Sequence, residues 1–575
     1  MKRISVIFLM SVLAIGYAYG QGEQEGPRRE VTLYNVYKPS LSENRKRSFL
    51  PMITDTARIT PDITYNVTTK PFYPEYRISP LKAATLQPDP LSKLYKSHIT
   101  LGAGNYYTPF AELSITNERS KKNALGFYAR HFSTNGKVKL DNDEKVFAGY
   151  MDNDASIFGK KFFRTSILEG SIDYSQKTRY AYGFNTADTI GAWEPRPENR
   201  DIRRVFQDIG ATASYKSIST DSSDLAYNID LGYDLFMYKE DLMRHQASFA
   251  GLFAKEVKGF YGQLGAGFDY YYTSGGVVSP EFTVSLSPGI SKKSQLWNFR
   301  LGADLVYDRD FSYAAGYDTL GTVKEGVKIY PDIRFGFSIM PTYMDFFLSL
   351  TGKLDKNTPQ NVIVDNPYTN NIFQQRNTDY SMIAAAGFSG NNGIGGNYLV
   401  SAAYSMVKDM IFYVTKEPGP GRYFYSVYDD VDLLNLHGEI DGEITDKLSF
   451  SGSGNWYQYN TVRLVAAPNK PNWDAEFGLK YNLRDKILAG IDVSAIGKRT
   501  LSGYTNVEMA FYLPPPPVPL TEPAHLNLNF SAEYRYTKIL SFWLKANNIG
   551  VNRYNEYAYY PTQRFLFMLG FSYSL

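Results

Sequence analysis

The sequence RFLFMLGFSYSL, residues 564–575, alternates almost perfectly between an apolar face and a second face on which Gly570, Ser572 and Ser574 lie. The apolar side chains occupy every second position, namely Phe565, Phe567, Leu569, Phe571, Tyr573 and Leu575. Because successive side chains of a strand point to opposite faces, the pattern predicts a strand with one aromatic, apolar face. A strand of this kind at the end of a chain is typical of a transmembrane β-barrel, whose last strand has lipid on one side and the lumen on the other.

The first twenty residues have the features of a secretory signal peptide. Lys2 and Arg3 precede an apolar run at residues 4–14, and Ala18-Tyr19-Gly20 supplies a small-x-small cleavage pattern before Gln21. No later run of about 18 apolar residues follows, which argues against a helical membrane protein. An exported chain whose apolar residues alternate is expected in the outer membrane of a Gram-negative cell.

Composition agrees with a barrel that has aromatic girdles and a wet lumen. Aromatic residues make up 15% of the chain, with 48 Tyr and 36 Phe, and 61 Lys and Arg nearly balance 58 Asp and Glu. This balance gives no electrostatic case for a nucleic-acid partner. Cysteine is absent, so the chain has neither a disulfide framework nor a thiolate metal site.

The same alternation recurs inside the chain, with polar residues on the second face. Residues 473–483 and 487–495, joined by the tight turn Arg484-Asp485-Lys486, are the clearest pair. The polar residues that this pattern assigns to the lumen are His437, Glu439, Asp441, Glu443, Asp474, Glu476, Lys480, Asp492, Glu533 and Arg535. A cation site at His437 is conceivable among its acidic neighbours, but a hydrated wall is favoured, and no metal or other cofactor is predicted.

Connection lengths alternate between long and short in the second half of the chain. Long segments are expected at 355–378, 407–433, 460–472, 498–523 and 550–563, and short turns between them. Bacterial barrels have short periplasmic turns and longer external loops, so the carboxyl terminus is expected in the periplasm. We count about 22 strands from residue 97 onward, with 24 as the alternative if residues 145–184 hold an additional hairpin. The fold class is therefore a large all-β antiparallel barrel.

The tail resembles the end of TonB-dependent receptors. The resemblance rests on Asn548-Ile549-Gly550-Val551-Asn552-Arg553-Tyr554, then Tyr560-Pro561, and Arg564 before the last strand. Gly550 and Val551 depart from that family's usual Phe and polar residue. The resemblance implies a wide receptor barrel for solute uptake, and the ending Gly570-Phe571-x-Tyr573-x-Leu575 resembles the signal read by the barrel-assembly machinery.

The amino-terminal part does not resemble the globular plug of that family. About 75 residues separate Gln21 from the first strand, and prolines punctuate them at positions including Pro39, Pro51, Pro61 and Pro71. The expected organisation is a signal peptide at 1–20, a periplasmic or lumenal extension at 21–95, and the barrel at 96–575. Within the extension, residues Glu30, Val31, Thr32, Leu33 and Tyr34 are similar to a TonB box; an ordinary extended tether is the alternative.

Two functions remain open. The first is a TonB-dependent-receptor-like importer or diffusion channel, and the second is a plugless scaffold subunit of an outer-membrane assembly. No catalytic constellation can be assembled, so the protein is not expected to be an enzyme. The expected partners are outer-membrane lipid, the barrel-assembly machinery, and either TonB or a partner outer-membrane protein or lipoprotein.

Overall fold

The computed structural model describes most of the chain from residue 95 onward. The described residues are 95–117, 120, 122–186, 198–218, 224–238, 242–274, 280–312, 322–370, 375–393, 395–415, 422–501 and 520–575. The amino-terminal segment with its predicted signal peptide and TonB-box-like residues Glu30–Tyr34 lies outside them.

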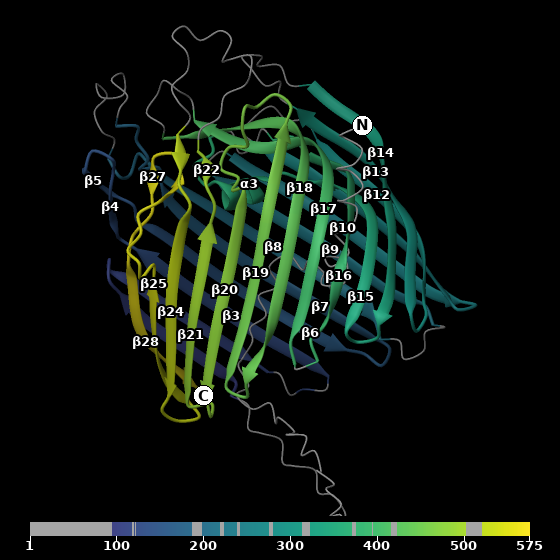
Figure 1. Cartoon of the computed structure of the whole chain (residues 1–575), viewed down its shortest axis with the longest axis horizontal. Helices are drawn as coiled ribbons and strands as arrows, with labels where there is room; N and C mark the ends of the chain where they lie inside the picture. The colour runs from purple at the N-terminus through teal and green to yellow at the C-terminus, as the bar shows by residue number, and fades with distance from the viewer. Residues whose placement is uncertain are drawn as a thin grey trace, which may run out of the picture. The chain divides into compact units, whose positions relative to one another are not determined.

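Twenty-two strands form one antiparallel sheet that closes on itself (Figure 1). Each wall strand pairs with its neighbours in the chain, and β1 also pairs with β28, which closes the barrel. In chain order the wall strands are β1 (Ser97–Gly104), β2 (Thr108–Thr116), β3 (Asn123–Thr134), β6 (Tyr150–Phe162), β7 (Ser166–Tyr180), β8 (Arg203–Ser217), β9 (Ala226–Tyr238), β10 (Leu242–Val257), β11 (Phe260–Ser274), β12 (Glu281–Lys293), β13 (Trp297–Ser312), β14 (Thr322–Met340), β15 (Met344–Asp355), β16 (Thr378–Asn391), β17 (Asn397–Thr415), β18 (Phe424–Thr445), β19 (Leu448–Thr461), β20 (Trp473–Leu483), β21 (Ile487–Ile496), β24 (His525–Arg535), β25 (Leu540–Asn547) and β28 (Leu566–Ser574).

The outer face of the barrel is apolar. Large hydrophobic side chains on the wall strands are exposed at every second position, among them Leu231, Leu252, Val284, Leu301, Ile333, Val400, Leu436, Ile440, Phe477, Ile491, Leu526 and Leu569. The residues between them face inward and are largely polar. A surface of this kind is stable only against lipid, and closure leaves no unpaired strand edge in the membrane. The predicted transmembrane β-barrel is confirmed.

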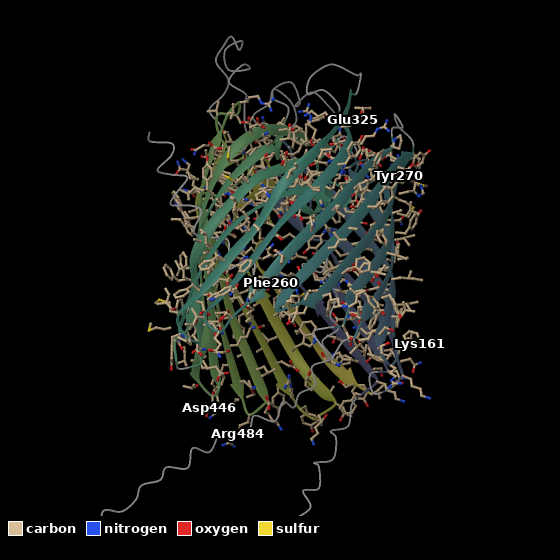
Figure 2. All side chains as sticks on the ribbon, turned by 90° about the vertical axis from the view of Figure 1, so that its right-hand side faces the viewer. Lys161, Phe260, Tyr270, Glu325, Asp446 and Arg484 are labelled. Carbon is tan, nitrogen blue, oxygen red and sulfur yellow. The ribbon has the colours of Figure 1, made fainter. Side chains whose placement is uncertain are left out.

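Short turns and the carboxyl terminus lie at one end of the barrel. Asp446 and Arg484 mark two of these turns, and Glu325 and Tyr270 lie toward the opposite end (Figure 2). Leu575 exchanges backbone hydrogen bonds with Ser97, so the two ends of the barrel sheet meet at this short-turn end. The opposite end carries the longer connections and is called the long-loop end below.

The structure settles the strand count at 22 and corrects two details. The alternative of 24 strands is wrong, because the additional hairpin, β4 (Lys137–Lys139) with β5 (Lys145–Phe147), forms a separate two-stranded sheet. The expected long segment at 407–433 is largely strand, because β17 continues to Thr415 and β18 begins at Phe424. Two further pairs also stand outside the wall, β22 (Arg499–Thr500) with β23 (Thr521–Glu522), and β26 (Asn555–Tyr557) with β27 (Tyr560–Pro561).

A tryptophan covers the seam where the barrel closes. Gly102 of β1 pairs with Gly570 of β28, which pairs with Trp543 of β25. A Cβ atom would lie 2.4 Å from the indole at Gly102 and 2.5 Å from it at Gly570. Only glycine therefore lets the indole lie flat across both strands on the inner face.

The described residues contain one α-helix, α3 (Pro359–Asp365), in the connection between β15 and β16. Thr358 caps it by accepting a hydrogen bond from the Asn361 amide, and Pro359 occupies its first turn. In the part of the chain that the structure describes, no helix is long and apolar enough to cross a membrane.

Candidate functional site

The connection between β15 and β16 folds across the mouth at the long-loop end. We call its described residues, 356–370 and 375–377, the strap. The strap is held at its base by the wall: Lys356 Nζ lies 2.6 Å from Asp308 Oδ1, and the Asn377 amide donates to Asp310 Oδ2 over 3.2 Å. Its position near the long-loop end can be followed from α3 in Figure 1.

Beyond its base, the strap contacts a distant wall strand, β8, and the connection between β25 and β28. Gln360 Nε2 donates to Asp208 Oδ1 of β8 over 3.2 Å, and Arg204 Nη2 of β8 donates to the Thr369 carbonyl over 2.7 Å. The Tyr557 hydroxyl of β26 donates to the Asp365 carbonyl over 2.6 Å.

These contacts show that the strap spans the lumen. Around the ring of 22 strands, β8, the β15–β16 base and the β25–β28 connection each stand about a third of the circumference apart. With a strand spacing of about 4.8 Å and a tilt of about 40°, the barrel radius is roughly 20 Å, so these sectors are on the order of 35 Å apart. A segment that starts at the β15–β16 base and touches β8 must cross part of the mouth.

Five aromatic rings join the strap to the wall, and we call them the mouth cluster: Tyr182, Tyr368, Phe424, Tyr557 and Tyr560. The rings of Tyr368 and Tyr560 stack with centroids 3.8 Å apart, and Tyr182 lies 4.9 Å from Tyr560. The Tyr560 hydroxyl also donates to the carbonyl of Arg422. The cluster brings together residues that are up to 378 positions apart in the chain and gives the strap an apolar core at the mouth.

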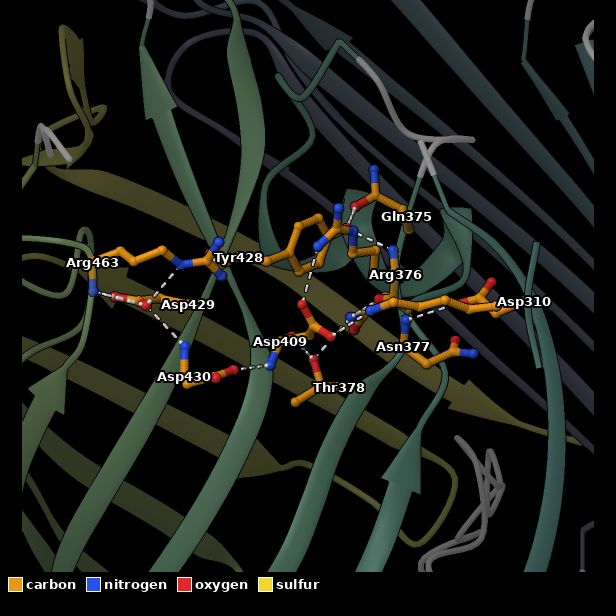
Figure 3. A network of polar contacts seen from close by, with 12 residues as sticks. Asp310, Gln375, Arg376, Asn377, Thr378, Asp409, Tyr428, Asp429, Asp430 and Arg463 are labelled. Carbon is orange, nitrogen blue, oxygen red and sulfur yellow. Dashed lines mark hydrogen bonds and ion pairs between the residues drawn. The ribbon is translucent and has the colours of Figure 1, made fainter. Parts of the chain in front are cut away.

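A polar network supports the strap from the side of β17 and β18 (Figure 3). A β-bulge between Val407 and Met410 puts Asp409 at φ 50° and turns its carboxylate toward the strap. Arg376 Nη1 lies 3.2 Å from Asp409 Oδ1, and the Thr378 hydroxyl donates to the Asp409 carbonyl over 3.0 Å. The bulge therefore anchors the return of the strap to the wall.

Next to it, Asp429 organises the start of β18. Its carboxylate is fully buried and accepts from the Arg463 and Leu464 amides, each at 2.8 Å, and from the Asp430 amide at 2.9 Å. Asp430 in turn accepts from the Asp409 amide over 3.1 Å. These bonds connect the β19–β20 connection to the bulge in β17.

Burial raises the pKa values of several ionisable groups at the mouth. It raises the pKa values of the Tyr182, Tyr368, Tyr557 and Tyr560 phenols, which therefore stay protonated at neutral pH. Burial also raises the pKa of the Glu556 carboxyl in β26, and the nearby Arg499 and Arg179 oppose this shift only in part. The cluster can thus pack without uncompensated phenolate charges.

Deeper in the lumen, four of the predicted carboxylates come together. Glu439, Asp441, Glu476 and Asp492 line a hollow of ≈ 530 Å³ on the inner faces of β18 to β24. They occupy two cross-strand rows in which serine or glycine separates the acids: Glu439, Ser453, Glu476 and Ser494 in one, Asp441, Ser451, Gly478 and Asp492 in the other. The alternation avoids placing like charges directly opposite each other, which would be destabilising.

The other predicted lumen residues surround this hollow. His437 is buried, with Nδ1 2.8 Å from Asn455 Oδ1 and Nε2 2.9 Å from Glu439 Oε1. Asn455 also donates to Asp474. Glu443 and Lys480 both pair with Ser449, one row nearer the short turns, and Arg535 forms an ion pair with Glu533 at 3.3 Å. Among the described residues, no group of three or more His, Asp or Glu side chains could hold a metal ion.

The predicted assembly-signal residues divide between the two faces of β28. Phe571 and Leu575 have exposed side chains on the outer face, where Tyr573 also lies. Gly570 lies under Trp543 on the inner face. The hydroxyls of Ser572 and Ser574 contact Thr100 and His98 of β1, at 3.0 and 2.9 Å, inside the barrel.

Sequence reasoning did not find the strap or Arg204. Thr358 followed by Pro359 is a helix-start signal, and it is the one local sign of α3 in a segment that otherwise resembles an external loop. Arg204 is one of many arginines, and nothing in its sequence neighbourhood distinguishes it.

No family model matches this chain, and no curated protein matches its sequence. Solved structures do match. The ferric-catecholate import receptor Fiu from K12 E. coli is 9% identical and covers 84% of this chain and 82% of its own, with a TM-score of 0.59. The siderophore receptor PiuA from Acinetobacter baumannii is 12% identical (84% and 82%, TM-score 0.58), and the FrpB iron transporter from Neisseria meningitidis is 10% identical (84% and 82%, TM-score 0.63). At such identities the likeness shows the fold alone, and the receptor-type barrel expected from residues 548–575 is confirmed at that level.

Proposed function

We propose that the protein is an outer-membrane barrel of the TonB-dependent-receptor kind, through which a solute is taken up or passes. The observation that carries this proposal is a closed barrel of 22 strands whose polar lumen is spanned at the long-loop end by a folded strap. In this orientation the short turns and the carboxyl terminus face the periplasm, and the mouth cluster faces outward.

The width of the barrel supports passage over a purely structural role. A barrel of about 8 strands is filled by its own side chains, whereas one of 22 encloses a wide lumen. A segment that crosses the lumen near one end is then a means of controlling entry. The printed names of the similar structures, an import receptor, a siderophore receptor and an iron transporter, point in the same direction.

The acidic hollow gives the lumen a preference among solutes. Glu476 and Asp492 form no ion pair within 4.0 Å with another described residue, so their charges are available to whatever occupies the hollow. A wall of this kind attracts cations and hydrogen-bond donors and repels anions at mid-lumen. Cation preference in this part of the path is therefore part of the proposal.

Energised uptake would use residues 30–34. We propose that Glu30–Tyr34 pair with TonB by strand addition, a mode in which main-chain hydrogen bonds supply the affinity. Proline at Val31 or Thr32 would remove an amide that such pairing needs. Uptake that persists unchanged in both variants would show that these residues are an ordinary tether.

Conductance in planar bilayers tests passage itself. We expect small currents from the full chain, and larger ones when residues 21–95 are deleted or when the strap is loosened by Tyr560→Ala. The combined variant separates the two effects, because independent obstructions should each add to the current. If no variant conducts and another outer-membrane protein co-purifies at a fixed ratio, the chain is a scaffold subunit and the passage proposal fails.

Biogenesis is the last part of the proposal. The outer face of β28 is expected to be read by the barrel-assembly machinery, with Phe571 as the main aromatic contact. A Phe571→Tyr control keeps the aromatic ring and should assemble normally.

A further inference from the structure

Arg204 is a buried cation with no carboxylate partner. Its side chain is 2% exposed and projects inward from the start of β8. Nη2 donates to the Thr369 carbonyl over 2.7 Å, while Nε and Nη1 have no hydrogen-bond partner among the described residues. The rings of Phe206, Tyr238 and Tyr423 surround the guanidinium, at 5.4, 5.0 and 5.8 Å.

The charge around Arg204 is unbalanced. Its direct cross-strand neighbour is another arginine, Arg179 of β7, and that one is paired with Asp152 at 2.7 Å. Asp208, the next carboxylate along β8, accepts from Gln360 instead. The cations that act on Glu556 are Arg499 and Arg179. Of these two adjacent guanidinium groups, only that of Arg179 therefore has a carboxylate partner.

Aromatic faces compensate a buried cation only in part. A cation over a ring gains about 0.5–2 kcal/mol, whereas an ion buried without a partner costs several kcal/mol. Arginine also carries five N–H donors and no acceptor, so its unpartnered N–H groups can be satisfied only by acceptors brought to them.

Two further donors at this contact have no partner. Asn366 and Thr369 are both fully buried, and neither Asn366 Nδ2 nor the Thr369 hydroxyl has a hydrogen-bond partner among the described residues. The two belong to one turn of the strap, in which the Thr369 amide donates to the Asn366 carbonyl over 3.2 Å. Since the Thr369 carbonyl accepts from Arg204, the turn that carries these two donors lies against the Arg204 side chain.

We propose that Arg204, Asn366 and Thr369 form a binding site for an oxyanion, namely a carboxylate, sulfate or phosphate group carried by a solute in the lumen. Planar or tetrahedral oxygens of this kind match the guanidinium fork, and the amide and hydroxyl supply the remaining donors. A lipid headgroup is not the source, because Arg204 projects from the inner face of the wall and is buried.

Binding at this site would act on the strap. The oxyanion competes with the Thr369 carbonyl for Arg204, and an oxyanion can accept two parallel hydrogen bonds from the guanidinium whereas the carbonyl accepts one. A ligand shifts a conformational equilibrium by its difference in affinity between the two states. A solute whose oxyanion bridges Arg204 to Asn366 and Thr369 therefore favours the closed strap. This role in uptake rests on the proposed function, whereas the binding site does not.

Equilibrium dialysis of the full chain in detergent against radiolabelled inorganic sulfate tests the site. We expect saturable binding of one sulfate per chain, competed by phosphate and by acetate but not by chloride at matched ionic strength. Arg204→Gln should weaken binding at least tenfold, and Thr369→Val several-fold. The matched control is Arg179→Gln, which removes the neighbouring arginine already paired with Asp152 and should leave sulfate binding within about twofold.

The proposal is overturned if the full chain shows no saturable sulfate binding, or if Arg204→Gln binds as well as the unaltered chain. Should Arg204→Gln fail to fold, as judged by its heat-modifiable mobility, Thr369→Val and Arg204→Lys carry the test. Arg204→Lys keeps the charge but not the fork, so undiminished sulfate binding by it together with Thr369→Val contradicts the site. Sulfate binding without conductance would preserve the site and refute passage; conductance without sulfate binding would do the reverse.

Discussion

Replacing Tyr560 by alanine should open the mouth without unfolding the barrel. Tyr560 is 1% exposed, its ring stacks on Tyr368 of the strap, and its hydroxyl donates to the Arg422 carbonyl. It belongs to β27, which pairs with β26 and stands outside the ladder of wall strands. The cost of the substitution therefore falls on the contact between strap and wall.

The size of the effect follows from what Tyr560 touches. Truncating a large buried aromatic side chain to alanine costs about 3–5 kcal/mol, less where neighbours can move into the gap. Since about 1.4 kcal/mol corresponds to a factor of ten in an equilibrium constant, the open strap should become roughly a hundredfold to a few thousandfold more populated. Tyr560→Phe loses only the hydrogen bond to Arg422, about 1 kcal/mol, and Arg422 lies outside the strap, so the open population should rise by fivefold at most.

Amide hydrogen exchange measures this population. The Val362, Asn366 and Asn370 amides are hydrogen-bonded to the Thr358, Val362 and Phe424 carbonyls, so they exchange when the strap opens. We expect their exchange to accelerate by the factors above, while amides of wall strands such as β11 and β12 stay protected.

Tyr534→Ala is the matched control. Tyr534 is on β24 with its side chain 42% exposed on the outer face, so the same atoms are removed where lipid can replace the contact. Acceleration of the strap amides by less than tenfold in Tyr560→Ala, or equal acceleration in both variants, would show that the mouth cluster does not hold the strap closed.

Four other results are expected. Asp429→Asn replaces one accepting oxygen of the buried carboxylate by an NH₂ donor and should lower the free energy of unfolding by about 1.5–3 kcal/mol. The loss should appear as a lower urea midpoint of unfolding, and an unchanged midpoint would contradict the role of Asp429. Phe571→Asp should cost about 1–3 kcal/mol and reduce the amount of protein at the cell surface, which normal levels would refute. Burial at the mouth raises the pKa of Glu556, so the closed mouth binds the proton more tightly than the open one. Protection of the strap amides from exchange should therefore be greatest at a pH below the ordinary pKa of a glutamate and should fall as the pH rises through the raised pKa. Glu556→Gln should flatten this pH dependence. Glu476→Gln with Asp492→Asn should reduce cation-over-anion selectivity in reversal-potential measurements, and an unaltered potential would remove the hollow from the conduction path.

The wall of the barrel could be predicted because it repeats. Every strand has lipid on one face and the lumen on the other, so each shows the period of two, and 22 strands were countable from alternation alone. The first part of β18 was not predicted, because Asp429 and Asp430 interrupt the alternation and are typical of a loop. Their carboxylates are instead used for the β19–β20 connection and the bulge in β17.

The mouth could not be predicted because its contacts follow no period. Arg204, Thr369, Phe424 and Tyr560 meet through connections that are non-repetitive in sequence and come from different sectors of the ring. The lumen residues were assigned by parity alone. Their grouping into a hollow depends on the register between strands, which no single strand reveals.

The barrel closes by pairing β1 with β28 under Trp543, so the position of the chain ends around the ring is not fixed by the pairing of the strands. Ser97 and Leu575 exchange backbone hydrogen bonds, at 3.1 and 2.8 Å, as two residues beside a short turn would. A short linker between them, with a new break at the Arg484-Asp485-Lys486 turn, would give a circularly permuted barrel with every wall contact retained. In that permutant the last strand would be β20, whose final outward residue is Leu483, while β28 would become an internal strand. Its assembly in cells would distinguish two roles of a terminal aromatic strand. The strand is either a signal recognised by the insertion machinery or a strand needed to close the barrel.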